Sequence, residues 1–264
     1  MITILLTAQD EVSNLRELRE HLGDALPVIV VDSGSTDGSL ELAQATTGWR
    51  VVQHAYEGQA AQLNWALEHV VDTDWVFILD CDERLSAPPG ELRRLVELAD
   101  ASGKIAVAFR RRNYFGKRWI RFGGLYPDWQ VRLMRTHLRY EDRPVHGHVD
   151  VPEKSIYFAD QELTHVSYTD PDHYIRKLAH FTVKEALPAT AAASSRPRYR
   201  RLRTASHRLP FPGLTRFIYA YVIRQGFRDG RVGFYLALWA GFRGSVARGA
   251  QYLRAQDDLR VDRP

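Results

Sequence analysis

Five short apolar segments alternate with helix-forming stretches over the first 110 residues of the chain. The apolar segments span residues 2–7, 27–32, 50–54, 75–80 and 104–110. Segments this short that are apolar almost throughout are typical of strands buried on both faces of a sheet. We expect helices between them, near residues 13–22, 38–46, 59–70 and 90–100. The alternation predicts an α/β fold in which helices flank a mostly parallel, doubly wound sheet.

Polar residues follow three of these expected strands, at positions 7–11, 32–37 and 80–83. In doubly wound sheets, ligands bind beyond the carboxyl ends of the strands. We therefore expect these polar residues to face one common crevice.

The third of these polar groups is the most unusual, because Asp80, Asp82 and Glu83 directly follow a buried strand and their carboxylates repel one another. A hard divalent cation held by Asp80 and Asp82 would relieve that repulsion and leave coordination sites for a diphosphate. The other interpretation, which the residues alone leave open, is an acidic loop that begins the next helix.

Several classes of protein lack support in the sequence. The single cysteine, Cys81, rules out an internal disulfide framework and fits a reducing compartment, and no Cys/His cluster has the spacing of a zinc site. There is no Gly-x-Gly-x-x-Gly after the first strand and no Walker loop, so binding of dinucleotides and P-loop phosphoryl transfer lack their usual motifs. The N-terminus has no basic region, and its apolar run is too short for a signal peptide, which predicts a cytoplasmic protein.

Charge is distributed unevenly along the chain. Residues 171–264 contain 18 Lys and Arg against 6 Asp and Glu, whereas residues 1–170 contain 18 against 26. We therefore expect two domains, 1–170 and 171–264, with the second basic and helical. A charge separation of this kind indicates an anionic partner for the basic part, either a nucleic acid or a membrane surface.

The basic part also carries apolar and aromatic stretches. Residues 194–208 contain six arginines and no acid, and two expected helical stretches follow at 211–227 and 231–254. The longest apolar run there has nine residues, far short of the ~20 needed to cross a bilayer. We therefore expect helices that lie on a membrane surface, although a buried helical hairpin with a basic rim is an alternative. The side chains expected to enter the leaflet are Phe217, Tyr221, Phe234, Leu238 and Trp239.

Four segments, in this order and spacing, resemble the nucleotide-sugar-binding half of a glycosyltransferase family 2 enzyme with the GT-A fold: LLTAQDEVSNL, VIVVDSGSTDGSLELA, EGQAAQLNWAL and WVFILDCDERLS. Two later segments, RRRNYFGKRWIRFGGLYPDWQVRLMR and DRPVHGHVDV, resemble the branch of that family that includes lipopolysaccharide-core β-glucosyltransferases. The resemblance covers about residues 1–170. It implies an inverting hexosyltransferase with a nucleotide-sugar donor, by preference UDP-linked, and a glycan or glycolipid acceptor.

The resemblance implies roles for the residues that end the strands. Asp32 would accept a base N–H of a uracil-type nucleotide, and Thr7 and Asp10 would flank the base and ribose. Asp80 would contact the ribose or the metal, and Asp82 would bind Mg²⁺ or Mn²⁺ that bridges the diphosphate.

Two further residues are candidates for the nucleotide site. Gln62 stands where the family often has a basic residue close to the nucleotide. Arg132 is expected to contact a phosphate, because its planar guanidinium suits a diphosphate. A structural salt bridge is the other interpretation of Arg132.

An inverting transfer needs a base that takes the proton of the acceptor hydroxyl on the side opposite the leaving group. The candidates are Asp128, in YPDWQ, and His146, in PVHGHV. Gly147 stands where the resembled branch commonly has an acid. Asp128 could instead be a turn residue after a proline, and His146 an ordinary loop residue.

Two alternatives remain open from the sequence. Within the enzymes, the acceptor could be a polyprenyl phosphate, which is already anionic and needs little help from a base. In another class, the chain could be a nucleic-acid-binding protein with a nucleotide-binding domain, which we consider the weaker interpretation. The preferred one is a cytoplasmic enzyme that associates peripherally with the inner face of the cell membrane.

Overall fold

The computed structural model describes residues 1–141, 148–168 and 212–255. The described residues belong to two compact units. The first contains residues 1–112, 127–141 and 148–167, and the second contains residues 113–126 and the helices from residue 212 onward. The domain boundary predicted at residue 170 lies outside the described residues and stays a prediction.

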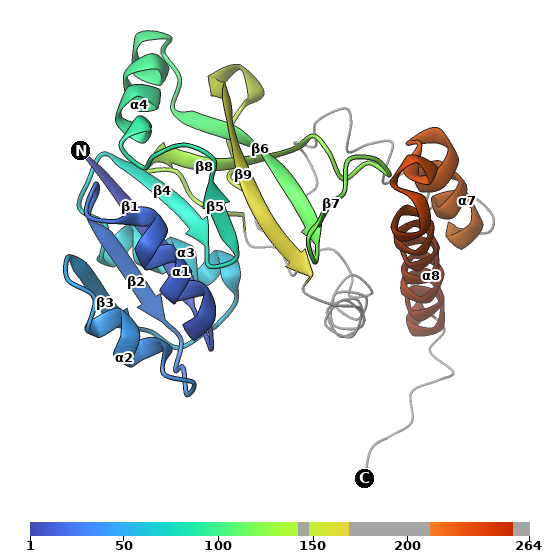
Figure 1. The fold of residues 1–264 in the computed structure, drawn as a ribbon, viewed down its shortest axis with the longest axis horizontal. Coiled ribbons are helices and arrows are strands. Elements are labelled where there is room, and N and C mark those ends of the chain that lie inside the picture. The colour runs from blue at the N-terminus through green and yellow to red at the C-terminus, as the bar shows by residue number, and fades with distance from the viewer. Residues whose placement is uncertain (142–147, 169–211, 256–264) are drawn as a thin grey trace. The chain divides into compact units, whose positions relative to one another are not determined.

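The first unit begins with a parallel sheet flanked by helices (Figure 1). Its strands, in spatial order, are β3 (Trp49–Gln53), β2 (Val28–Asp32), β1 (Ile2–Ala8) and β4 (Trp75–Asp80). The helices of this unit are α1 (Val12–Leu22), α2 (Ser39–Gln44), α3 (Gln59–His69) and α4 (Glu91–Ala101). These elements confirm the predicted alternation of strands and helices.

The sheet continues beyond β4 with strands in antiparallel contact. The order is β4, then β8 (Asp128–Arg135), β6 (Ala106–Phe115), β9 (Ile156–Tyr168) and β5 (Glu83–Leu85). Because β8 is antiparallel to both of its neighbours, β6 runs in the same direction as β4. The fifth predicted strand, 104–110, corresponds to β6, which begins later and extends to Phe115. The sheet is therefore mixed but mostly parallel, as expected for a GT-A-like α/β fold.

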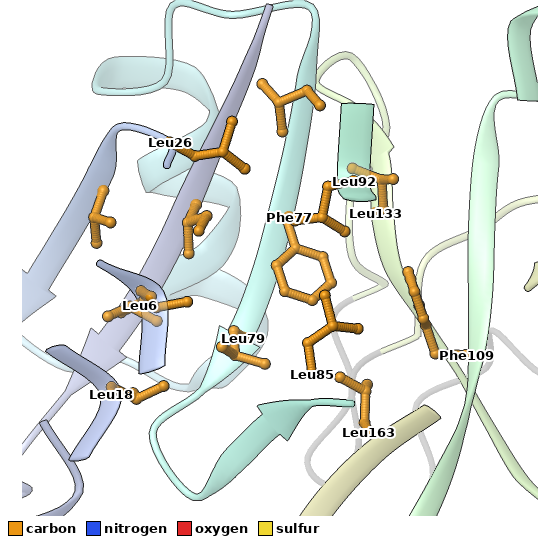
Figure 2. Packing of buried hydrophobic residues seen from close by; sticks show 14 of the residues in the cluster. Leu6, Leu18, Leu26, Phe77, Leu79, Leu85, Leu92, Phe109, Leu133 and Leu163 are labelled. Atoms are coloured by element: carbon orange, nitrogen blue, oxygen red, sulfur yellow. The ribbon is translucent and has the colours of Figure 1, made fainter. Parts of the chain in front are cut away.

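Both faces of the parallel part are covered by apolar side chains, because neighbouring residues of each strand point to opposite faces. On β1 and β4, Leu6 and Phe77 belong to a core on the side of α1 and α4, whereas Leu5 and Ile78 belong to a core on the side of α3. Figure 2 shows Phe77 among leucines from several elements of the first core. Burying each such side chain stabilises the fold by about 1.5–3 kcal/mol, which explains why these strands are apolar throughout.

The second unit contains a short hairpin and a group of helices. The end of β6 pairs with β7 (Arg118–Trp119). The helical segment consists of α7 (Pro212–Ile218), a π-helical turn η3 (Tyr219–Ile223), a 3-10 turn η4 (Gly226–Asp229) and α8 (Gly230–Ala255). The stretch expected as one helix over 211–227 is thus interrupted. At the interruption Gln225 has a left-handed φ of 56°, and a Cβ on Gly226 would lie 2.8 Å from the carbonyl oxygen of Ala220.

Close packing and one buried acid hold the second unit together. A Cβ on Gly213 of α7 would lie 2.9 Å from the carbonyl oxygen of Gly241 of α8, so the two helices can meet only at glycine. Asp229 is 4% exposed, and its Oδ2 accepts the backbone N–H groups of Arg121 (3.1 Å) and Phe122 (2.8 Å). That carboxylate ties the loop after β7 to the start of α8. No helix in the described part of the chain is long and apolar enough to cross a membrane.

Candidate active site

The carboxyl ends of three parallel strands converge, as the sequence predicted. β1 lies between β2 and β4, and its last residues pair in register with theirs: Ala8 lies opposite Asp32, and Thr7 lies opposite Asp80. Asp32 and Asp80 therefore lie on either side of the end of β1. This is the edge of a doubly wound sheet where ligands bind.

Two aspartates shape the loops that follow β1 and β2: Asp10 joins the two loops, and Asp32 holds its own loop. The Oδ1 atom of Asp10 accepts a hydrogen bond from the backbone N–H of Thr36 at 2.8 Å, and the backbone N–H of Asp10 donates to Ser35 Oγ at 3.0 Å. Asp32 is 1% exposed, and its Oδ1 accepts the backbone N–H groups of Gly34 (3.0 Å) and Ser35 (3.1 Å). Its Oδ2 accepts the Ser35 hydroxyl. Asp32 thus shapes the loop that begins where β2 ends.

Gln62, on α3, contacts the residues that directly follow β2 and β3. Its side chain is 1% exposed, and its Nε2 donates to Ser33 Oγ at 3.0 Å and to the carbonyl oxygen of His54 at 3.3 Å. Its Oε1 lies 2.7 Å from His54 Nδ1. The His54 ring stacks on Trp65, with centroids 3.8 Å apart and planes 19° apart. Sequence reasoning missed His54, and its place directly after a strand is the signal that could have found it.

A buried ion network connects the acids after β4 with β6 and β8. Glu83 has no exposed surface, and its Oε1 accepts hydrogen bonds from Arg132 Nη2 (2.7 Å) and Arg111 Nη1 (2.9 Å). Arg132 Nη2 also donates to Asp80 Oδ2. Arg132, expected to contact a phosphate, is thus 6% exposed and bonded to two acids of its own chain.

The same network reaches Asp128 at the start of β8. Asp128 Oδ2 accepts both Nε (2.9 Å) and Nη2 (2.8 Å) of Arg111, and its Oδ1 accepts Gln130 Nε2 at 2.8 Å. Two arginines therefore join Asp128, Glu83 and Asp80 in one chain of charges. Arg111 was missed from the sequence, although it lies two residues beyond the buried Phe109 and hence on the same face of β6.

Asp82 pairs with a histidine of another strand, and the second base candidate is not among the described residues. The Oδ2 of Asp82 is 3.2 Å from Nε2 of His165 on β9, a partner that the sequence analysis also missed. His146 lies outside the described residues. Among the residues that the structure describes, no group of three or more His, Cys, Asp or Glu side chains could hold a metal ion.

The comparison with protein families decides the assignment of the chain. The model of glycosyl transferase family 2 matches residues 3–159. The chain belongs to glycosyltransferase family 2. The chain spans about two fifths of the length of the curated relative that it matches. The predicted family is confirmed.

Individual relatives of this family 2 enzyme are distant. It is 35% identical over 108 residues to "Lipopolysaccharide core biosynthesis glycosyltransferase LpsC" of Rhizobium meliloti (strain 1021), a match that spans 39% of this chain and 39% of that protein. Among solved structures, "Crystal structure of S. aureus TarS 1-349" has a TM-score of 0.45 at 12% identity, over 97% of this chain and 92% of that one. "Crystal Structure of a Mycobacterial Protein" has a TM-score of 0.36 at 25% identity, over 43% of this chain and 41% of that one.

The electrostatics of the candidate site follow from burial and from the two arginines. Burial raises the pKa of the Asp80 carboxyl, and Arg132 offsets only part of that effect. Burial also acts to raise the pKa of Glu83, but Arg132 and Arg111 more than offset it and hold its pKa below the ordinary value. Glu83 is thus ionised and fully paired, whereas the charge of Asp80 is incompletely compensated.

Cys81, between the two candidate metal ligands, has a packing role. Its thiol is buried and lies 3.4 Å from the carbonyl oxygen of Thr7. Burial raises the pKa of the Cys81 thiol well above its ordinary value, and Glu11 and Asp80 add to the effect. The neutral thiol joins β4 to β1 beneath the site.

Proposed function

We propose that this enzyme transfers a hexose, with inversion, from a UDP-linked donor to a lipid-linked or polysaccharide acceptor at the cytoplasmic face of the membrane. The observation that carries the proposal is the convergence of Thr7, Asp32 and Asp80 at one sheet edge, with a network of charges that leads from Asp80 to Asp128. The proposed donor site and the proposed proton acceptor would thus be linked by one network of ion pairs.

Asp80 and Asp82 fit a divalent cation by their chemistry. Mg²⁺ is usually held by one or two carboxylates together with substrate phosphates and water, so two aspartates suffice where a diphosphate completes the shell. The incompletely compensated charge of Asp80 favours a cation at this place, and no described residue donates a hydrogen bond to its Oδ1. When bound, Mg²⁺ or Mn²⁺ would neutralise charge on the leaving nucleoside diphosphate.

The residues of this chain would divide the remaining work. Asp10 and Asp32 hold the two loops that would enclose the nucleoside beside Thr7. Arg132 would orient Asp80 toward the diphosphate, in place of the direct phosphate contact suggested by the sequence.

Proton transfer is assigned to Asp128. Its carboxylate would take the proton of the acceptor hydroxyl as that oxygen attacks the anomeric carbon and the bond to the diphosphate breaks. Arg111, which donates twice to Oδ2, would hold the carboxylate in place. His146 remains the alternative base.

The acceptor is proposed from the relatives. The similarity to a protein named for lipopolysaccharide core biosynthesis supports a lipopolysaccharide or related glycolipid acceptor. Transfer to a polyprenyl phosphate is the alternative, and it would make Asp128 dispensable because that acceptor is already ionised.

An exposed apolar face on the C-terminal helices supports the membrane location. Along this face, large apolar side chains recur every four residues and keep 38–63% of their surface exposed. We call these residues the apolar stripe: Leu214, Ile218 and Val222 on α7 and η3, and Phe234, Leu238, Phe242 and Val246 on α8. Exposed apolar side chains that recur in this way are typical of a contact with a partner or a membrane.

The charge of the same segment favours an anionic leaflet as the partner. Residues 212–255 contain seven arginines and one acid, Asp229, which is buried. A second copy of the chain would bring like charges together, whereas a leaflet with anionic lipid attracts each well-placed basic residue by about 1 kcal/mol. We propose that the apolar stripe enters the leaflet and that the arginines contact its headgroups.

Three residues that the sequence suggested for membrane contact are not members of the apolar stripe. Phe217 and Tyr221 stack on each other at 5.3 Å and both pack edge-on against Phe234 of the stripe. Trp239 stacks on Phe115 at 6.4 Å beside a small core around Ile120. Phe234 and Leu238 remain in the stripe, and Phe242, which was not named from the sequence, is its most exposed member on α8.

A panel of nucleotide sugars tests the enzyme proposal. We expect release of nucleoside diphosphate from a UDP-linked hexose, dependent on Mg²⁺ or Mn²⁺ and accelerated by a lipopolysaccharide-core acceptor. Turnover of GDP- or dTDP-linked sugars alone would refute the proposed donor. Acceleration by polyprenyl phosphate in place of the core acceptor would support the alternative acceptor.

A further inference from the structure

Gln62 fixes which nitrogen of His54 carries the proton. The Gln62 amide contacts Ser33 Oγ (3.0 Å), the His54 carbonyl oxygen (3.3 Å) and His54 Nδ1 (2.7 Å). A carbonyl oxygen can only accept, so the amide nitrogen must be the atom that faces it. The amide oxygen then faces Nδ1, which must therefore be the protonated ring nitrogen.

The other ring nitrogen is left as an acceptor. In neutral histidine with a proton on Nδ1, the Nε2 atom carries a lone pair. No described residue hydrogen-bonds to Nε2 of His54. The ring plane is held by the stack on Trp65, whose centroid lies 3.8 Å away, and the side chain is only half-buried. His54 therefore presents a lone pair that is fixed in direction and accessible.

His54 itself lies at the edge of the sheet where the nucleotide is proposed to bind. The backbone N–H of His54 donates to the carbonyl oxygen of Asp32 at 2.9 Å, so the two residues occupy neighbouring strand ends. The Asp32 carboxylate, by contrast, is 1% exposed and accepts three hydrogen bonds from its own loop. Of the two acceptors, His54 is the better placed for a ligand.

We propose that His54 Nε2 accepts the N3–H of the donor's uracil and that Gln62 is a positioning residue that keeps His54 in the required tautomer. This inference rests on the proposed UDP-linked donor and names the residue that selects its base. Cytosine and adenine carry no proton on the corresponding ring nitrogen, so the same contact would disfavour them. The role expected for Gln62 at the nucleotide would then be exerted through His54.

Binding of UDP by the whole chain, measured by calorimetry, tests the contact. His54→Phe keeps an aromatic ring on Trp65 but removes the acceptor, and we expect about threefold to tenfold weaker binding, the value of one neutral hydrogen bond. For the donor sugar, KM should rise with kcat little changed. His69→Phe is the matched control, because His69 stacks on the same Trp65 but is exposed and far along α3.

A modified nucleotide makes the test specific. N3-methyl-UDP lacks the proton in question, so wild-type protein should bind it more weakly than UDP, and His54→Phe should bind both alike. If His54→Phe keeps the wild-type preference for UDP, the proposal is wrong. Binding of UDP with no turnover of any UDP-linked sugar would count against the proposed function but leave the base contact intact.

The tautomer can be measured directly by ¹⁵N NMR of the histidine rings. We expect His54 to carry its proton on Nδ1, and its Nε2 signal to shift when UDP is added. In Gln62→Leu the ring should populate the other tautomer and bind UDP more weakly. A proton on Nε2 in the wild-type protein would overturn the inference without any variant.

Discussion

Arg132 Nη2 lies 2.7 Å from Glu83 Oε1 at a position where the glutamate has no exposed surface. Buried charges of this kind persist only when they are paired, because taking a lone charge out of water costs several kcal/mol. Glu83 is therefore the centre on which Arg132 and Arg111 are both held, and through them Asp80 and Asp128.

Replacing Glu83 should destabilise the first unit strongly. In Glu83→Gln each arginine loses one of the two carboxylates that compensate it, and we expect a loss of about 3–5 kcal/mol in the free energy of unfolding, as for other broken buried ion pairs. Chemical denaturation followed by circular dichroism measures it. Glu17→Gln is the control, because Glu17 is exposed and pairs with Arg84 at the surface. Equal stability of the two variants would mean that the buried network contributes little.

Removing the proposed metal ligand should abolish turnover of the donor. Asp82→Asn replaces a charged ligand with a neutral and poorer one, so we expect nearly complete loss of activity and weak binding of Mn²⁺ in the presence of UDP. Asp72→Asn, at an exposed site ahead of β4, should behave as wild type. Full activity of the wild-type enzyme in excess chelator would exclude a metal-dependent mechanism.

The assignment of the base predicts a loss in kcat alone. Asp128→Asn keeps an oxygen that can accept from Arg111, so the fold should persist, but the amide cannot take the proton. We expect kcat to fall by about 10² or more, with little change in KM for the donor. Steady-state kinetics of Asp128→Asn and His146→Ala decide between the two candidates. If only the histidine variant loses activity, His146 is the base.

The parallel half of the sheet could be read from the sequence because strands buried on both faces must be apolar throughout. Strands β8 and β9 lack such runs, since the charged residues Arg132 and Glu162 lie on them in buried ion pairs. A pattern of apolar residues therefore could not predict them. The order in which they join the sheet depends on contacts between distant segments.

The same reasoning explains what was and was not predicted of the site. Asp32 and Asp80 are found from the sequence because they end apolar strands, and parallel strands bring their carboxyl ends together. Their partners carry no local signal. Arg111 and Arg132 meet Glu83 only after β6 and β8 have joined the sheet, and His165 reaches Asp82 only through β9. The acids were visible in the sequence. Of the cations that hold them, Arg132 was named, with a salt bridge as one of its two interpretations, whereas Arg111 and His165 were missed.

The apolar stripe predicts how the protein binds membranes. We expect the full-length chain to bind liposomes that contain anionic lipid, less tightly as salt rises, because salt screens the arginines. Leu238→Ser with Phe242→Ser should weaken binding about tenfold or more, since burying one such side chain is worth about 1.5–3 kcal/mol. Both side chains are already exposed, at 45% and 63%, so the fold should not lose stability.

A matched control tests whether weaker binding is specific to the stripe or follows from the loss of any exposed apolar side chain. Phe158 of the first unit is 44% exposed, close to the exposure of Leu238, and Phe158→Ser should leave liposome binding unchanged. Cosedimentation with vesicles of defined anionic content measures all three proteins, with every arginine kept. If high salt abolishes binding but the serine substitutions do not weaken it, the membrane contact is electrostatic and the stripe does not enter the leaflet. Unfolding of the Leu238 and Phe242 variant would show that the stripe packs within the protein, because a face that meets only lipid contributes nothing to the folded state in water.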